Sequence, residues 1–216
     1  RRAHDRPRGN SVCSASAVLD FMKFLVPIIL AAGESRRMKK PKPYLPIGGA
    51  TFLEKIANDL REAGVNLWGG VVYNTSHEDL IKNLRLSRLQ LIPNSRQELG
   101  QIYSLQLALN QIAEKNCDAI VCLADHPLVD RETYRILLKA RAESPGKIII
   151  PTYKKKRGHP IIIPGGLFSE ILSFPPEKAG GMREILRGHA YLIREVPTED
   201  EGVLADLDTP EDLARL

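Results

Sequence analysis

Apolar and polar positions fall into two alternating patterns along the chain. Continuous apolar runs of strand length occupy residues 24–30, 68–73, 89–92, 118–124, 147–151, 161–164 and 203–207. Apolar positions at helical spacing occupy residues 52–63, 78–84, 102–112 and 131–142. Strands and helices that alternate in this way favour right-handed crossovers between parallel strands. The pattern therefore predicts an α/β fold: a three-layer, Rossmann-like domain with a mostly parallel sheet.

The composition agrees with one globular domain. At 216 residues, with 43% apolar and 26% charged residues, the chain has enough material for a core and is not globally disordered. No apolar run reaches the roughly 20 residues of a membrane helix, so no membrane partner is expected. The net charge is +5, but its cations gather locally with few aromatic residues among them. This favours an anionic small molecule over nucleic acid.

The N-terminal segment differs in composition from the rest of the chain. Residues 1–21 are rich in Arg, Ser, Asp and Pro, and we expect them to be a disordered or added extension to a domain spanning residues 22–216. A cationic targeting peptide is the alternative for that segment.

The chain has three cysteines: Cys13, Cys117 and Cys122. Their odd number, without metal-ligand spacing, favours a reducing compartment and a cytoplasmic location.

The most informative stretch is IILAAGESRRMKKPK at residues 28–42. The apolar run ends at residues 31–33, where the side chains become small and the backbone can approach a ligand. Five cations then follow within seven residues: Arg36, Arg37, Lys39, Lys40 and Lys42. Exposed backbone N–H groups beside fixed positive charge suit a polyphosphate. A solvated basic loop is the alternative interpretation.

Carboxylates follow two of the expected strands. Asp125 ends the apolar run 118–124, and Pro127 prevents that strand from continuing. Such a carboxylate suits a cation, although capping a turn is the commoner role. The sequence DLDTPED at residues 206–212 approximates a helical capping box, which leaves Asp206 and Asp208 unexplained.

Four further features allow either a binding role or a structural one. Gly100 and Ser104 can expose N–H donors to a ligand, or can simply begin an amphipathic helix. The lysine-rich residues 154–157 form the tip of an expected hairpin, which by default is a solvated edge. His159 can face a substrate or hydrogen-bond its own loop, and Arg183 can be an exposed residue at a helix entrance.

Several motifs together resemble those of the molybdenum-cofactor cytidylyltransferase family of nucleotidyltransferases. The matching segments, in the family's order, are LAAGESRRM with the following KPK, LADHP, GHP and DLDTPED. The resemblance covers nearly everything from Met22 onward. Lys39 stands where the family usually has glycine, and His126 replaces its more usual glutamine.

The resemblance implies transfer of a nucleotidyl group with loss of pyrophosphate, and it assigns residues to roles. Arg37, Lys42 and Asp125 are expected to be catalytic, and Mg²⁺ is expected on Asp125 and Asp206, the latter chosen over Asp208. The expected nucleotide contacts are Leu30, Ala31, Ala32, Gly33, Ser35, Arg37, Lys42, Asn94, Gly100 and Ser104. The expected acceptor contacts are Lys155, Arg157, Gly158, His159 and Arg183.

Within this family the resemblance is closest to enzymes that transfer CMP from CTP to molybdopterin. Ala32 favours CTP, because the resembling guanylyltransferases carry a second glycine there. A sugar- or alditol-phosphate nucleotidyltransferase is the alternative enzyme. A chaperone that binds a nucleotide or the finished cofactor, for a molybdoenzyme client, is the alternative of another class.

Overall fold

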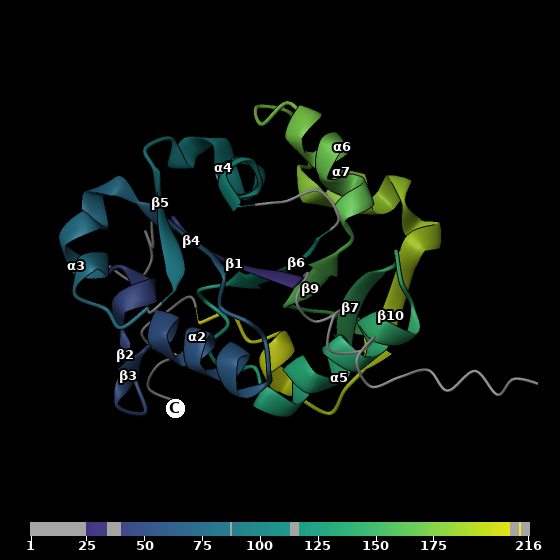
Figure 1. The fold of residues 1–216 in the computed structure, drawn as a ribbon, viewed down its shortest axis with the longest axis horizontal. Coiled ribbons are helices and arrows are strands. Elements are labelled where there is room, and N and C mark those ends of the chain that lie inside the picture. The colour runs from purple at the N-terminus through teal and green to yellow at the C-terminus, as the bar shows by residue number, and fades with distance from the viewer. Residues whose placement is uncertain (1–24, 34–39, 87, 113–116, 208–211, 213–216) are drawn as a thin grey trace, which may run out of the picture.

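The computed structural model describes residues 25–33, 40–86, 88–112, 117–207 and 212. An eight-stranded sheet runs in the order β10-β7-β9-β6-β1-β4-β5, with β8 paired to β7, and helices cover both of its faces (Figure 1). Its strands are β1 (Leu25–Ala31), β4 (Gly69–Asn74), β5 (Leu89–Asn94), β6 (Asp118–Leu123), β7 (Ile148–Tyr153), β8 (Lys156–Arg157), β9 (Ile161–Ile163) and β10 (Ile193–Pro197). A separate hairpin joins β2 (Pro46–Ile47) to β3 (Ala50–Thr51).

Strand direction divides the sheet into two regions. β1 pairs in parallel with both β4 and β6, and β5 extends this parallel region. β9 lies antiparallel to β6 and to β7, whereas the edge strand β10 is parallel to β7. Most strand pairs are thus parallel, and the predicted mostly parallel, Rossmann-like α/β fold is confirmed.

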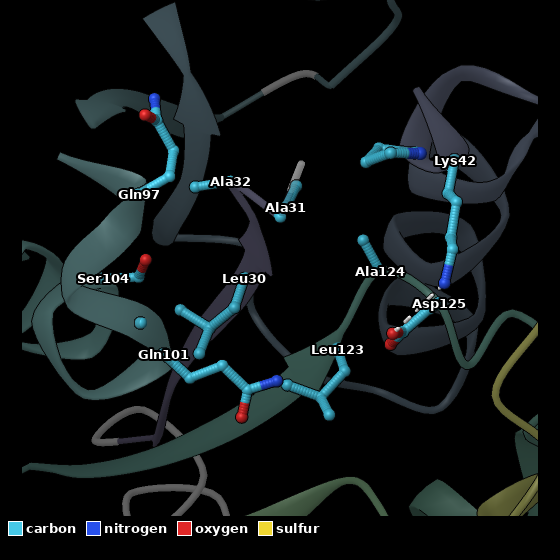
Figure 2. Close-up of a pocket in the computed structure, with 13 residues that line it drawn as sticks. Leu30, Ala31, Ala32, Lys42, Gln97, Gln101, Ser104, Leu123, Ala124 and Asp125 are labelled. Carbon is cyan, nitrogen blue, oxygen red and sulfur yellow. Dashed lines mark ion pairs between the residues drawn. The ribbon is translucent and has the colours of Figure 1, made fainter. Parts of the chain in front are cut away.

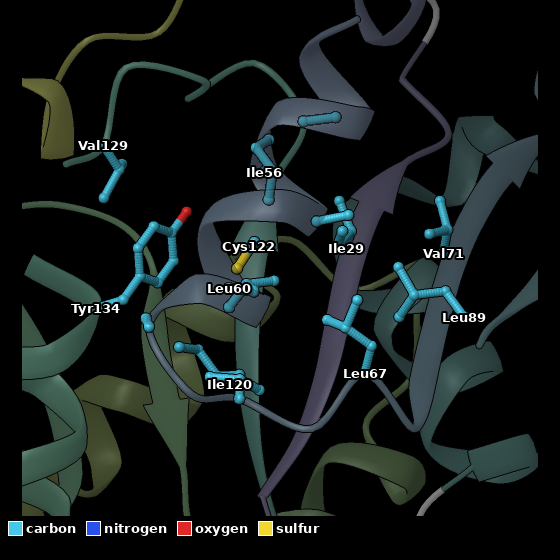
Figure 3. Close-up of a cluster of buried hydrophobic side chains, with 14 of the residues drawn as sticks. Ile29, Ile56, Leu60, Leu67, Val71, Leu89, Ile120, Cys122, Val129 and Tyr134 are labelled. Atoms are coloured by element: carbon cyan, nitrogen blue, oxygen red, sulfur yellow. The ribbon is translucent and has the colours of Figure 1, made fainter. Parts of the chain in front are cut away.

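Two apolar cores hold the layers together because β1 sends alternate side chains to opposite faces. Ile29 faces a core shared with α2 and α5, part of which is drawn in Figure 3. Ile28 faces a second core shared with α4, α6 and α7. The helices are α2 (Phe52–Glu62), α3 (Glu78–Lys82), α4 (Gly100–Ile112), α5 (Arg131–Glu143), α6 (Phe168–Ser173) and α7 (Met182–Gly188).

Local signals set both ends of α2. The Thr51 hydroxyl accepts a hydrogen bond from the Glu54 N–H, and the Glu54 carboxylate accepts one from the Thr51 N–H. Gly64 adopts a φ of +96° just after the helix, a conformation that favours glycine.

One predicted strand is wrong. Residues 203–207 form no strand. Val203 ends the short 3₁₀ helix η6 (Glu201–Val203), and residues 204–207 continue as a loop; we call residues 203–207 the crossing loop. Its apolar side chains anchor this loop, since Val203 is fully buried and Leu207 packs with Leu45 and Phe52. Among the described residues the last strand is β10, which sequence analysis did not predict.

Several expectations lie outside the described residues. These are the extension at residues 1–21, the cationic positions 34–39 and the acidic segment 208–211. Among the described residues, no helix combines the length and apolar character needed to cross a membrane. Cys117 and Cys122 are both buried.

Candidate active site

A first cavity lies where β1 and β6 end, and the start of α4 forms its opposite wall (Figure 2). The predicted nucleotide contacts that line it are Leu30, Ala31, Ala32, Gly33, Lys42, Gly100 and Ser104. Ala31 and Ala32 are buried, and the space around Gly33 is open. Small side chains therefore leave the backbone of this strand end accessible to a ligand. Ser35 and Arg37 lie outside the described residues.

The entrance of α4 depends on Gly100 and Asn94. Gly100 has a φ of +76° and ψ of −168°, a conformation open almost only to glycine. Asn94 is fully buried and does not line the cavity. Its amide donates to the Ser104 hydroxyl at 3.0 Å, and its side-chain oxygen accepts from the Arg96 N–H at 2.7 Å. Asn94 therefore positions the Ser104 hydroxyl.

Asp125 lies at the end of β6, beside two potential cations. Its carboxylate oxygens are 3.9 Å from Lys42 Nζ, the pair dashed in Figure 2, and 3.9 Å from His126 Nε2. Both distances are at the outer limit of an ion pair, and the Asp125 side chain keeps 31% of its surface exposed. The carboxylate is therefore held near positive charge and open to the cavity.

A second cavity opens on the other side of Asp125. It is lined by predicted acceptor residues, namely Arg157, Gly158, His159 and Arg183, and also by Asp125 and Asp206. Much of the remaining wall is apolar and comes from five elements; it consists of Ile102, Leu105, Val121, Ile150, Ile161, Met182 and Leu186. This cavity thus combines cations and carboxylates with an extensive apolar lining.

Gly158 and His159 pack tightly against the crossing loop. A side chain at Gly158 would collide with the backbone oxygen of Val203, and the His159 N–H donates to that same oxygen at 2.9 Å. The His159 ring lies 5.4 Å from the ring of His126. Burial, and then the neighbouring His126, lower the pKa of His159 to about 4, so its imidazole is neutral at physiological pH.

The exposed lysines at the hairpin tip do not line this cavity. Lys155 is exposed and does not line the cavity, and Lys154 lies 4.9 Å from the centre of the Tyr153 ring. Arg157 lines the cavity but also pairs with Glu195 at 2.7 Å. For Lys155 the geometry therefore favours the solvated-edge alternative.

The two cavities meet, and a few residues line both of them: Leu30, Gln101, Leu123 and Asp125. Gln97 and Gln101 lie in the first cavity although sequence analysis did not select them. The available signal was their spacing around Gly100, because residues that flank a helix entrance face the same ligand as its N–H groups.

Asp206 lies near Asp125 for a reason that the sequence did not predict. It does not end a strand; the crossing loop carries it, and the Leu207 N–H fixes that loop by donating to the Asp125 backbone oxygen at 2.9 Å. Among the described residues, no three or more His, Cys, Asp or Glu side chains form a metal cluster. Two carboxylates nevertheless fit Mg²⁺, which often takes one or two protein oxygens and completes its shell with phosphates and water.

Ligands of an open α/β sheet bind beyond the carboxyl ends of its strands, and the first cavity of this Rossmann-like sheet lies there. A family model described as the MobA-like NTP transferase domain matches residues 27–195. The chain therefore belongs to the MobA-like NTP transferase family, which confirms the resemblance in its sequence motifs.

Similar proteins carry diverse names. Nicotine blue oxidoreductase from Paenarthrobacter nicotinovorans is 28% identical over 198 residues, which are 88% of this chain and 94% of that one. The crystal structure of Rv0371c from Mycobacterium tuberculosis has a TM-score of 0.75 at 23% identity, over 88% and 95% of the two chains. Molybdopterin-guanine dinucleotide biosynthesis protein A from Archaeoglobus fulgidus has a TM-score of 0.59 at 18% identity, over 88% and 95%. At these identities the two structures show a shared fold.

Proposed function

We propose that this nucleotidyltransferase moves CMP from CTP to the phosphate of molybdopterin and releases pyrophosphate. The observation that carries the proposal is the meeting of two unlike cavities at Asp125. One has the small side chains and helix entrance that suit a triphosphate, and the other combines cations with an apolar wall. An oxygen of the acceptor phosphate forms a bond to the α-phosphorus as the bond to the β-phosphate oxygen breaks. The electron pair leaves with pyrophosphate.

Such a transfer depends on alignment and on neutralised charge rather than on a protein nucleophile. N–H groups at the start of α4 would bind nucleotide phosphates, and Lys42 would neutralise charge that accumulates on the α-phosphate. Arg37, outside the described residues, is proposed to hold the departing phosphates. Asp125 and Asp206 would hold Mg²⁺, which supplies further neutralisation and orients the triphosphate when it is bound.

The composition of the acceptor cavity favours a heterocyclic acceptor. Arg183 and Arg157 can bind a phosphate, whereas the apolar wall offers few partners for the hydroxyl groups of a sugar or alditol. Ala32 lines the first cavity, and a methyl group there would narrow the space for a purine base. These features support molybdopterin as acceptor and CTP as donor.

Pyrophosphate release, measured with CTP, GTP or UTP and with molybdopterin or a sugar phosphate, tests the proposal. We expect release with CTP, Mg²⁺ and molybdopterin together. Release only with a sugar phosphate would support the alternative enzyme, and tight binding without turnover would support a chaperone. Because one relative is named nicotine blue oxidoreductase, reduction of nicotine blue is measured in the same assay. Reduction of an added dye without any pyrophosphate release would contradict nucleotidyl transfer.

A further inference from the structure

Gln101 occupies the boundary between the two cavities. Of the residues that line both, Leu30 and Leu123 are apolar and Asp125 is an acceptor of hydrogen bonds. Gln101 is therefore the member of this set whose side chain can donate hydrogen bonds. Figure 2 shows its side chain extending from α4 toward Leu123, across the space between the helix and the end of β6.

The helix that carries Gln101 is firmly held. Ile102 and Leu105 are buried in the core beside it, and Asn94 binds the Ser104 hydroxyl. One turn further along, the Gln106 amide donates to the backbone oxygens of Ile171 and Phe174 at 2.8 and 2.7 Å. The Gln101 side chain is itself exposed, and no hydrogen bond to it is formed within the described part of the chain. A rigid backbone thus presents an unengaged amide where two substrates would meet.

The chemistry of the transfer needs a donor at this place. Two phosphate groups, the attacking acceptor and the attacked α-phosphate, must approach although both are negative. An amide nitrogen carries two N–H bonds, so a single glutamine can donate to one oxygen of each group. Being uncharged, it does not compete with a metal ion for Asp125.

We propose that Gln101 is a catalytic residue whose amide bridges an α-phosphate oxygen of the nucleotide and an oxygen of the acceptor phosphate. This inference rests on the proposed function for its reacting groups. The bridge holds the two phosphates in line and stabilises the charge that moves between them as the bond to pyrophosphate breaks.

Kinetics of Gln101→Glu and Gln101→Ala test the bridge. The first keeps the side-chain length but replaces the donors by a negative carboxylate; the second removes the group. Loss of one such donor costs roughly 10² in kcat, and we expect that loss in Gln101→Ala and a larger one in Gln101→Glu. The matched control is Gln111→Glu, on the exposed far end of α4, where the side chain binds Gln90 at 3.0 Å. Its kcat should stay within a factor of about two of the wild type.

A binding measurement separates this inference from the proposed function. Calorimetry would give the affinity of α,β-methylene-CTP with and without inorganic phosphate, which stands for the acceptor phosphate. We expect phosphate to raise that affinity severalfold in the wild-type protein and in Gln111→Glu, but not in Gln101→Ala.

The two kinds of failure are distinguishable. A wild-type protein that releases no pyrophosphate would refute the proposed function, and the coupled binding would still decide the role of Gln101. Equal coupling in the wild type and Gln101→Ala, or no coupling in the wild type, would overturn the bridge. So would turnover of Gln101→Ala within a factor of about two of the wild type.

Discussion

The first cavity, proposed to bind the nucleotide, and the second, proposed to bind the acceptor, are built by different means. The first lies in the parallel region of the sheet, where small residues after β1 and the entrance of α4 offer backbone groups. The second lies in the region around the antiparallel strand β9, where side chains from distant segments form the walls. Recognition by backbone fixes a phosphate site to the fold itself, whereas recognition by side chains leaves acceptor choice open to substitution. The spread of names among similar proteins agrees with this difference.

The largest expected effect is at Asp125, where the cavities meet. Asp125→Asn keeps the shape of the side chain but removes its charge, so the fold should persist while kcat falls by about 10² or more. Asp206→Asn should lower kcat less, because Asp206 lies on the crossing loop rather than at the end of a strand. Steady-state kinetics with a Mg²⁺ titration measure both. Near-normal turnover in Asp125→Asn would remove this residue from the site.

A second prediction concerns the charge state of the acceptor wall. The folded-state pKa of His159 is about 4, below the ordinary 6.5, so the unfolded chain binds the extra proton first as pH falls. The neutral His159 side chain makes its full contribution to the free energy of unfolding above pH 6.5, and this contribution is lost as the pH falls from 6.5 to 4. The loss between pH 6.5 and 5 amounts to about 2 kcal/mol. Denaturant unfolding at both pH values should show a smaller drop in His159→Asn than in the wild type. An equal drop in the free energy of unfolding of both proteins would show that a group other than His159 takes up the proton.

The acceptor cavity should respond to Arg183 without a change on the nucleotide side. Arg183→Ala removes a cation from that cavity alone, and we expect the acceptor KM to rise about tenfold while the CTP affinity stays constant. Arg187→Ala is the control, because Arg187 is exposed one turn later on α7 and lines neither cavity. A matching loss of CTP affinity in Arg183→Ala would show that the two cavities are not separate in function.

The smallest expected effect is at the hairpin tip. Lys155 is exposed and lies outside the cavity lining, so Lys155→Ala should change the acceptor KM by less than about twofold. Any change should vanish as ionic strength rises, because salt screens attraction between exposed charges. Acceptor KM values at low and high salt measure this. A large effect that persists in high salt would return Lys155 to the set of acceptor contacts.

The same contrast explains which parts of the molecule could be predicted. Local sequence alone predicts the places of residues 30–33 and Asp125, because an apolar run that stops at small or acidic residues shows where a buried strand ends. β10 lacks such a signal, since charged side chains at Arg194 and Glu195 interrupt its apolar positions at the sheet edge. The loop at residues 203–207 was mistaken for a strand because burial in a loop requires the same apolar side chains.

Tertiary contacts decide what local patterns leave open. Gln101 has an ordinary sequence environment, and only the packing of α4 against the two strand ends gives it a place between the cavities. The family resemblance put Asn94 among the expected nucleotide contacts, yet its side chain bonds within the protein. Asp206 reaches the acceptor cavity through a loop whose path depends on Val203 and Leu207.

The most direct test is mass spectrometric detection of cytidylylated molybdopterin after incubation of the protein with CTP, Mg²⁺ and molybdopterin. The wild-type protein should form this product together with one pyrophosphate for each molecule made. Asp125→Asn should form it at about a hundredth of the rate or less. Absence of the product with the wild-type protein, or equal amounts with Asp125→Asn, would contradict transfer at the junction of the two cavities.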